Sequence, residues 1–208
     1  GRHLHKIDAA AVGALAPKAG AAARLAVDRE RRRAINRHHS AAHLIHWALR
    51  KVLGTHVRQA GTSKTADRMR FDFSHFEAVT HAQLLEVEQL VNAKVLDNAQ
   101  VQSYETEFDQ KPEGTLAFFG DKYGDTVRVL EAGKTFELCG GTHVKATGDI
   151  GIIKVISESS IGSNLRRIEA VTGENTFNYL LETTRTLSNA AEMLGTQPSD
   201  IMSTVQRK

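Results

Sequence analysis

The chain has 208 residues, 41% of them hydrophobic and 25% charged, which is the composition of a globular protein and excludes a disordered or fibrous one. No run approaches the roughly 18 consecutive apolar residues that span a bilayer, so we expect no membrane contact. A single cysteine cannot form an internal disulfide and fits the reducing cytoplasm, and the net charge of +3 leans toward a polyanionic partner.

The first part of the chain predicts an irregular stretch followed by a long helix. Residues 1–27 are rich in alanine and glycine, which favours short strands or loops over a full domain. Asp28 has the form of an N-cap, and the pattern predicts a helix from about Arg29 to Leu53, with Gly54 as its stop. The apolar positions at helical spacing, which predict one buried face, are Ile35, Ala42, Ile45, Leu49 and Val52.

The next segments predict two short strands and a second helix. In "RMRFDFS", strand alternation puts Arg70 and Asp72 on one face and the two phenylalanines on the other. Thr80 and Gln83 have the spacing of a capping box, which predicts a helix that continues to about Asn98.

Strand-like segments dominate from residue 101 to residue 172, and a helical pattern returns after Gly173. The segments are VQSYETEF, TLAFFG, VRVLEA, TFELCG, GIIKVISES and LRRIEAV, separated by turns rich in Gly and Asp. This order predicts an α+β fold, with a mostly antiparallel sheet packed against long helices and a helical C-terminal extension.

Two pairs of metal-binding residue types stand far apart in the chain. His39 and His43 are four residues apart in the predicted helix, so they lie on the same face. Cys139 and His143 are also four apart, in "ELCGGTHV", where two glycines let the backbone turn tightly. Because nitrogen and sulfur ligands of this kind suit Zn²⁺, the two pairs together predict one zinc site.

The neighbours of the histidine pair narrow the chemistry of that site. Ser40 stands where a zinc peptidase of the H-E-x-x-H class needs its glutamate, which argues against a peptidase. His46 is expected in the core or behind the ligands. A purely structural zinc is the alternative, although the small residues Ser40, Ala41 and Ala42 leave room for a small ligand.

These motifs together resemble a known family. "NRHHSAAHLIHWALRKVLGTHVRQAG", "RMRFDFSH", "FGDKYGDTVRV", "ELCGGTHV" and "RRIEAVTG" are similar to the editing domain of alanyl-tRNA synthetase and to free-standing hydrolases of mischarged alanine tRNA. Threonyl-tRNA synthetase editing domains have a similar metal pattern, but "CGGTHV" and "RRIEAVTG" indicate the alanine system. The resemblance implies a β-barrel tail at 1–27, a zinc-binding editing core at 28–172 and a helical extension at 173–208. The missing ATP-binding module and the start without Met predict a fragment of a longer synthetase.

Several residue roles follow from the resemblance alone. It implies the same zinc ligands, His39, His43, Cys139 and His143. Gln59 matches a polar pocket residue, and Ser40 keeps a hydroxyl of the family's H-T-A-T-H pattern, so both become catalytic candidates. Ala42 replaces the second threonine of that pattern, which bears on how the substrate is discriminated. The residues expected near the acceptor end of the tRNA, unless they form ion pairs within the sheet, are Arg70, Asp72, Arg166 and Arg167.

The resemblance therefore predicts a cytoplasmic, Zn²⁺-dependent aminoacyl-tRNA hydrolase that removes Ser or Gly from tRNA(Ala), alongside synthetase and C-terminal regions outside this chain. This is the second sieve of a double-sieve editing scheme. The alternative is a non-catalytic tRNA-binding module with a structural zinc, and hydrolysis of seryl-tRNA would separate the two. A small amino-acid esterase or a peptidase is a third possibility.

Overall fold

The computed structural model describes residues 22, 26–117 and 123–207, and the β-barrel tail expected at 1–27 lies almost wholly outside them. The helices and strands, in chain order, are α2 (Arg29–Leu53), β1 (Gln59–Lys64), β2 (Met69–Ser74), α3 (His81–Leu96), β3 (Val101–Glu107), β4 (Thr126–Ala132), β5 (Thr135–Leu138), β6 (Ile153–Gly162), β7 (Leu165–Thr172), α4 (Glu174–Leu194) and α5 (Ile201–Gln206).

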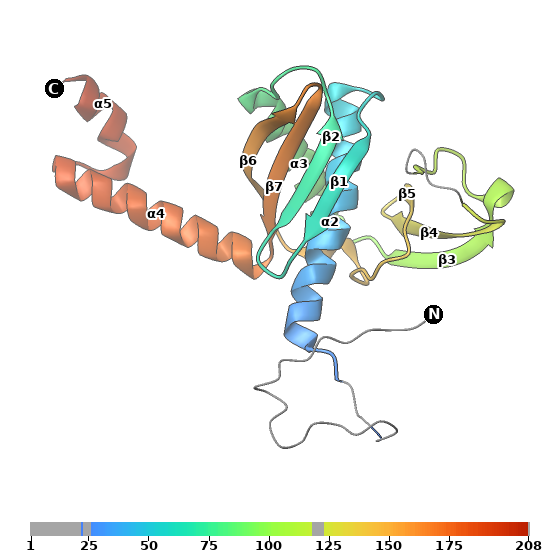
Figure 1. Ribbon diagram of the computed structural model, residues 1–208. Coiled ribbons are helices and arrows are strands. Elements are labelled where there is room, and N and C mark those ends of the chain that lie inside the picture. Colours follow the sequence, from blue (N-terminus) through green and yellow to red (C-terminus); the bar gives the residue numbers. More distant parts are fainter. Residues whose placement is uncertain (1–21, 23–25, 118–122, 208) are drawn as a thin grey trace.

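Two antiparallel sheets and two long helices form the body of the described chain. The larger sheet has the strand order β1-β2-β7-β6, and α2 and α3 cover one of its faces (Figure 1). The smaller sheet, β3-β4-β5, lies to one side of α2, while α4 and α5 extend away from the body on the other. The α+β fold predicted from the element order is thereby confirmed.

The two helices begin where their capping residues predict. The Asp28 side chain accepts a hydrogen bond from the Arg31 backbone N–H at 3.0 Å, and Gly54, with φ at 116°, ends α2. Thr80 and Gln83 form the predicted capping box of α3. The apolar face of α2 is buried against the sheet, so burial rather than propensity holds this helix in place.

The register of the larger sheet decides which side chains face the helices. Phe71 pairs with Ile168 across β2 and β7, and both are fully buried in the core beneath α2. Asp72 pairs with Arg167 in the same register, so these two side chains lie on the opposite face of the sheet, away from α2.

One predicted strand is reduced to a single bridge. In the described part of "TLAFFG", Leu116 pairs only with Glu137, through bonds from Leu116 N to Phe136 O and from Leu138 N to Leu116 O. Just before it, Pro112 has no backbone donor and Gly114 has φ at 78°, so the extended conformation cannot continue in that direction.

The helix predicted after Gly173 is present as α4. Most of its residues are exposed, including Phe177 and Leu181. The division of the chain into domains at residues 28 and 173 stays a prediction. Within the described part of the chain, no helix is both long enough and apolar enough to cross a membrane.

Candidate metal centre

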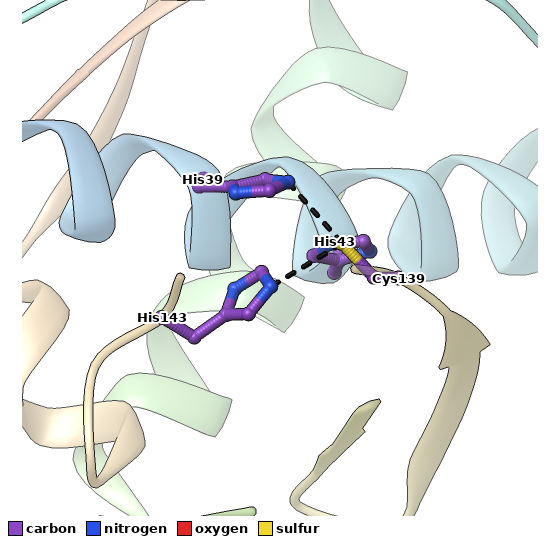
Figure 2. Close-up of side chains that lie close together, drawn as sticks. All are labelled: His39, His43, Cys139 and His143. Atoms are coloured by element: carbon purple, nitrogen blue, oxygen red, sulfur yellow. Dashed lines mark hydrogen bonds between the residues drawn. The ribbon is translucent and has the colours of Figure 1, made fainter. Parts of the chain in front are cut away.

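The four predicted ligands converge between α2 and the turn that follows β5. Figure 2 shows His39, His43, Cys139 and His143 facing one another, and one donor atom from each lies within 4.8 Å of all the others. Cys139 Sγ is 3.5 Å from His39 Nε2 and 3.3 Å from His143 Nε2. Tetrahedral zinc, with bonds of about 2.0–2.3 Å, separates its donors by about 3.5 Å, so the cluster has the right size for that ion.

The turn that carries Cys139 and His143 fits closely against α2. A Cβ atom added to Gly141 would overlap the His39 imidazole, whereas one added to Gly140 would meet nothing within 4 Å. Only the second glycine is therefore required by packing. Arg128 holds the turn from the sheet side, where its guanidinium donates to the Gly141 carbonyl at 2.6 Å. Asn36 on α2 binds the His143 carbonyl oxygen from the helix side, at 3.3 Å.

Ser40 lies behind His143. Its side chain is buried, and its hydroxyl accepts a hydrogen bond from the Val144 backbone N–H at 3.2 Å. The same oxygen is 3.2 Å from His143 Nδ1. If His143 turns Nε2 toward a metal, Nδ1 carries the proton and donates to Ser40, so the hydroxyl is placed to orient the ring. The catalytic role expected of Ser40 stays a prediction.

Glu137 is a second buried group of the centre, to which the sequence analysis assigned no role. Its carboxylate accepts hydrogen bonds from His43 Nδ1 and, at 2.8 Å, from His46 Nδ1. The Nε2 atoms of both histidines are buried without a partner in the described residues. His43 therefore has one nitrogen fixed by a carboxylate and the other left over, which is the usual arrangement of a metal-ligating histidine. The position of Glu137 two residues before Cys139 was the only signal in the sequence.

The charges within the cluster set its protonation. Burial raises the pKa of the Cys139 thiol, but hydrogen bonds with His143 and His39 and the nearby imidazole of His43 outweigh this and bring the pKa to about 3. Burial lowers the pKa of His43, but the charge and hydrogen bond of Glu137 and the nearby Cys139 thiolate outweigh this and raise the pKa to about 9. Cys139 is thus held as the thiolate that binds metals, while His43 keeps a proton that a metal must displace.

Glu137 is held ionised by its partners. Burial raises the pKa of its carboxyl group, but the charge of His43, together with hydrogen bonds from His43 and His46, lowers the pKa to about 2. Burial also lowers the pKa of His143, which favours the neutral imidazole that binds a metal.

Cavities open on two sides of the cluster. One, of about 650 Å³, is lined by His143 together with Arg33, Arg37 and Lys145; we call it the His143-side cavity. The other, the His43-side cavity, has about 410 Å³, and its lining includes His43 and Glu137.

Gln59 and Ala42 do not join the four ligands. Gln59 lines a smaller cavity of about 240 Å³, which also contains His46 and shares Arg50 and Thr55 with the His43-side cavity. Ala42 is 3% exposed and packs in the hydrophobic core. The roles expected of these two residues, in the reaction and in substrate discrimination, stay predictions.

The structure brings Arg70, Asp72 and Arg167 together, away from the metal centre. Arg167 forms two hydrogen bonds with the Asp72 carboxylate, at 2.7 and 2.9 Å, and Arg70 Nε lies 3.5 Å from the same carboxylate. They lie on the face of the sheet that points away from α2.

Arg166 is separated from this group. It pairs with Phe73 across the strands, so its side chain leaves from the opposite face, where it binds Glu158 at 2.6 and 2.7 Å. The contact of these arginines with an acceptor end stays a prediction.

Comparison with known proteins places this arrangement in a family. Residues 127–169, which include nearly all of β4, the whole of β5 and the Cys139 turn, match the family model described as "Threonyl and Alanyl tRNA synthetase second additional domain". The chain is 56% identical over 205 residues to an alanine–tRNA ligase of Opitutus terrae, an alignment that covers 97% of this chain and 22% of that protein. The ligases of Desulfitobacterium hafniense and Desulforudis audaxviator are 52% and 45% identical, over 86% and 100% of this chain and 21% and 23% of theirs. The chain thus belongs to the alanyl-tRNA synthetase family, as a segment that spans about a fifth of the length of these relatives.

Proposed function

We propose that this chain is a zinc-binding hydrolase module that removes serine or glycine from mischarged tRNA(Ala) within a longer synthetase. One observation supports the proposal above the others. Three histidines and the only cysteine of the chain, from segments about a hundred residues apart, bring their donor atoms within 4.8 Å of one another beside two cavities. The sequence relatives, which are alanine–tRNA ligases, supply the substrate class.

The donor set fits zinc rather than a hard cation. Three imidazoles and a thiolate are the nitrogen and sulfur ligands that Zn²⁺ prefers, whereas Mg²⁺ and Ca²⁺ take oxygen ligands. The buried Nε2 of His43, which has no partner in the described residues, is the kind of orphan atom that a metal ligand leaves behind. When bound, zinc would polarise an ester carbonyl or lower the pKa of a water molecule.

The residues of the chain have distinct tasks in this proposal. Glu137 keeps the proton of His43 on Nδ1, so that Nε2 stays available to the metal, and it holds His46 by its second oxygen. Ser40 orients His143 from behind. Gln59 lines the cavity next to His46, where its amide can donate to or accept from a polar group of the aminoacyl ester.

A non-catalytic, tRNA-binding module with a structural zinc is the second candidate. Four protein ligands would leave a tetrahedral ion no open position, which is the pattern of structural zinc sites. In a catalytic site, one of the four must give way to water or substrate.

The experiment that separates the two candidates is deacylation of tRNA(Ala) charged with Ser, Gly or Ala. We expect hydrolysis of the first two, its loss with a chelator, and its recovery when zinc is returned. Gln59→Ala should slow hydrolysis while the zinc content stays at one per chain, with Gln89→Ala, an exposed residue of α3, as the matched control. A chain with full zinc that releases no amino acid from any of the three substrates would support the structural candidate.

A further inference from the structure

The His143-side cavity is lined by cationic side chains that neither bind the metal nor orient its ligands. It has a volume of about 650 Å³, and it touches the metal centre through His143. Arg33, Arg37 and Lys145 line it. In the described part of the chain, the side chains of Arg33 and Lys145 have no hydrogen-bond or ion-pair partner, so their charges remain available to an outside group.

The first turns of α2 continue this positive surface outward. Arg29, Arg33 and Arg37 stand four residues apart, so they form a stripe along one side of the helix with a rise of about 6 Å between neighbours. Arg37 is held in place by a bond from its Nε to the Asp149 carbonyl oxygen at 3.1 Å. The stripe lies at the N-terminal end of α2, where the helix dipole also favours negative charge.

The acidic residues of the cavity offset these cations only in part. The Asp149 carboxylate already accepts hydrogen bonds from the backbone N–H groups of Lys145 and Ala146, at 3.3 and 3.1 Å. Glu174 is an exposed residue of the first turn of α4. The cavity therefore presents unpaired cations together with two carboxylates, of which that of Asp149 is already bound to the backbone and that of Glu174 is exposed.

Several other cations near the centre and on the larger sheet are more committed, although Lys134 of the His43-side cavity has no side-chain partner in the described residues. In the His43-side cavity, one Arg50 nitrogen donates to the carbonyl oxygens of Thr55 and Val57, both at 2.7 Å. Lys51 lies over the Trp47 ring, 5.4 Å from its centroid. On the larger sheet, Arg166 and Arg167 are each bound by a carboxylate through two nitrogens.

We propose that the His143-side cavity and the Arg29–Arg33–Arg37 stripe bind the phosphodiester backbone of an RNA strand whose 3′ end reaches the metal centre. Guanidinium and ammonium groups at one-turn spacing suit a row of phosphates, and His143 places the end of that row at the cluster. This proposal specifies where the RNA backbone binds, and it rests on the proposed function for the identity of that RNA. It places the backbone at residues of α2 and Lys145 rather than at the arginines of the sheet.

Binding of uncharged RNA tests the cavity without requiring hydrolysis. The probe is a fluorescent hairpin of the tRNA(Ala) acceptor stem with its unpaired 3′ end, titrated with the 208-residue chain at several salt concentrations. The Arg33→Ala/Lys145→Ala double variant should raise Kd about tenfold, and it should reduce the slope of log K against log salt by about 1.4, since each lost single-strand phosphate contact removes about 0.7. The control, Lys134→Ala/Arg185→Ala, loses the same net charge from the His43-side cavity and from α4.

The cavity variant, Arg33→Ala/Lys145→Ala, and its control together test the proposal. It is overturned if the control weakens binding as much as the cavity variant does, because net charge alone would then explain the effect. It is equally overturned if the cavity variant binds like the parent chain, or if the parent chain binds no hairpin. Zinc content equal to that of the parent shows that each variant is folded at the centre.

A second arm compares substrates with and without phosphates. The cavity variant should cleave seryl-adenosine, which has no phosphate, at the parent rate, and it should cleave seryl-tRNA with a raised KM. An equal loss on both substrates would place the two cations in the reaction rather than in backbone binding, against the proposal. If the parent cleaves neither substrate, the proposed function fails, while the hairpin titration still tests whether the cavity binds RNA.

Discussion

The metal centre and the arginine–carboxylate pairs of the larger sheet both gather charged or ligating side chains, but they differ in how far those side chains are bonded to one another. On the sheet, Arg166 and Arg167 each meet a carboxylate through two hydrogen bonds, so these two charge pairs are formed within the chain, although Arg70 Nε beside Asp72 is buried without a hydrogen bond. At the centre, His43 and His46 each keep a buried nitrogen without a partner in the described residues. Because buried polar atoms are costly to leave unpaired, the free nitrogen of His43, a member of the His39–His43–Cys139–His143 cluster, indicates an external ligand, whereas the paired carboxylates of the sheet do not.

The largest effect should come from removing the thiolate. Cys139→Ala deletes the donor that lies 3.3 and 3.5 Å from two imidazoles, so zinc affinity should fall more than about 100-fold, beyond what changes behind the ligands usually cause. A competition titration with a chromophoric chelator measures this. His81→Ala, an exposed histidine at the start of α3, is the control. Full zinc affinity in the cysteine variant would break the comparison, since the centre would then need no ligand from that turn.

Glu137→Gln should have the next largest effect. The amide keeps the shape of the side chain but loses the charge that fixes His43 and His46, so zinc affinity should fall about 10- to 100-fold. Glu131→Gln, in the neighbouring strand β4, should leave the affinity unchanged. If both variants bind zinc like the parent, Glu137 is only a buried packing residue, and its two histidine contacts carry no function.

The pH dependence of zinc binding tests the protonation states of His43 and Cys139. Since the pKa of His43 is raised to about 9, zinc must displace its proton at neutral pH, and affinity should fall about tenfold for each unit that pH is lowered. Cys139, with its pKa lowered to about 3, is already deprotonated and adds no further slope. Competition titrations between about pH 7 and about pH 8 report the number of protons released. A hundredfold change per unit would mean that Cys139 also releases a proton.

Arg166→Ala tests the arginine–carboxylate pairs of the larger sheet. The variant leaves the Glu158 carboxylate, whose side chain is 9% exposed, without its two bonds, so the free energy of unfolding should fall by about 1–2 kcal/mol. Urea unfolding measures this, with Arg185→Ala on α4 as the control. We expect binding of the acceptor-stem hairpin to change less than about twofold. A weaker binding with a smaller salt slope would instead support the role that the family resemblance implies for Arg166.

Ala42→Thr should have the smallest effect. A threonine hydroxyl near the ester could donate a hydrogen bond worth about 0.5–1.5 kcal/mol, which changes the ratio of Ser to Ala deacylation rates by about 2- to 13-fold. Because Ala42 is buried in the core, the free energy of unfolding must be measured alongside, with Ala41→Thr as a second buried control. A ratio unchanged within about twofold would show that discrimination lies elsewhere, with Gln59 as the next residue to change.

The sequence predicted those features that depend on local spacing. Asp28 and Gly54 mark the ends of α2 because capping and left-handed turns act within a few residues, and His39 and His43 share a face because the helix repeats every 3.6 residues. The two distant pairs could be assigned to one site only because each supplies two of the four ligands that a tetrahedral zinc site needs.

Features that depend on packing between distant segments were not predictable in the same way. Glu137 reaches His43 and His46 through the docking of β5 against α2, which no spacing records. The separation of Arg166 from Arg167 follows from strand alternation, but their carboxylate partners depend on the pairing of β7 with β2 and β6. Arg33 and Lys145 line one cavity only when the turn after His143 folds onto α2.

The close fit of Gly141 against His39 has a consequence for recognising this centre in distant sequences. A methyl group at position 141 would occupy the space of the imidazole, so an alanine there should abolish the centre without altering any donor atom. A search pattern should therefore treat this glycine as strictly as the cysteine and the histidines, and it should leave position 140 free, in the form C-x-G-x-H. Homologues that keep all four donors but carry a larger residue at 141 are expected to have lost the metal, and to be misassigned by any method that counts donors alone.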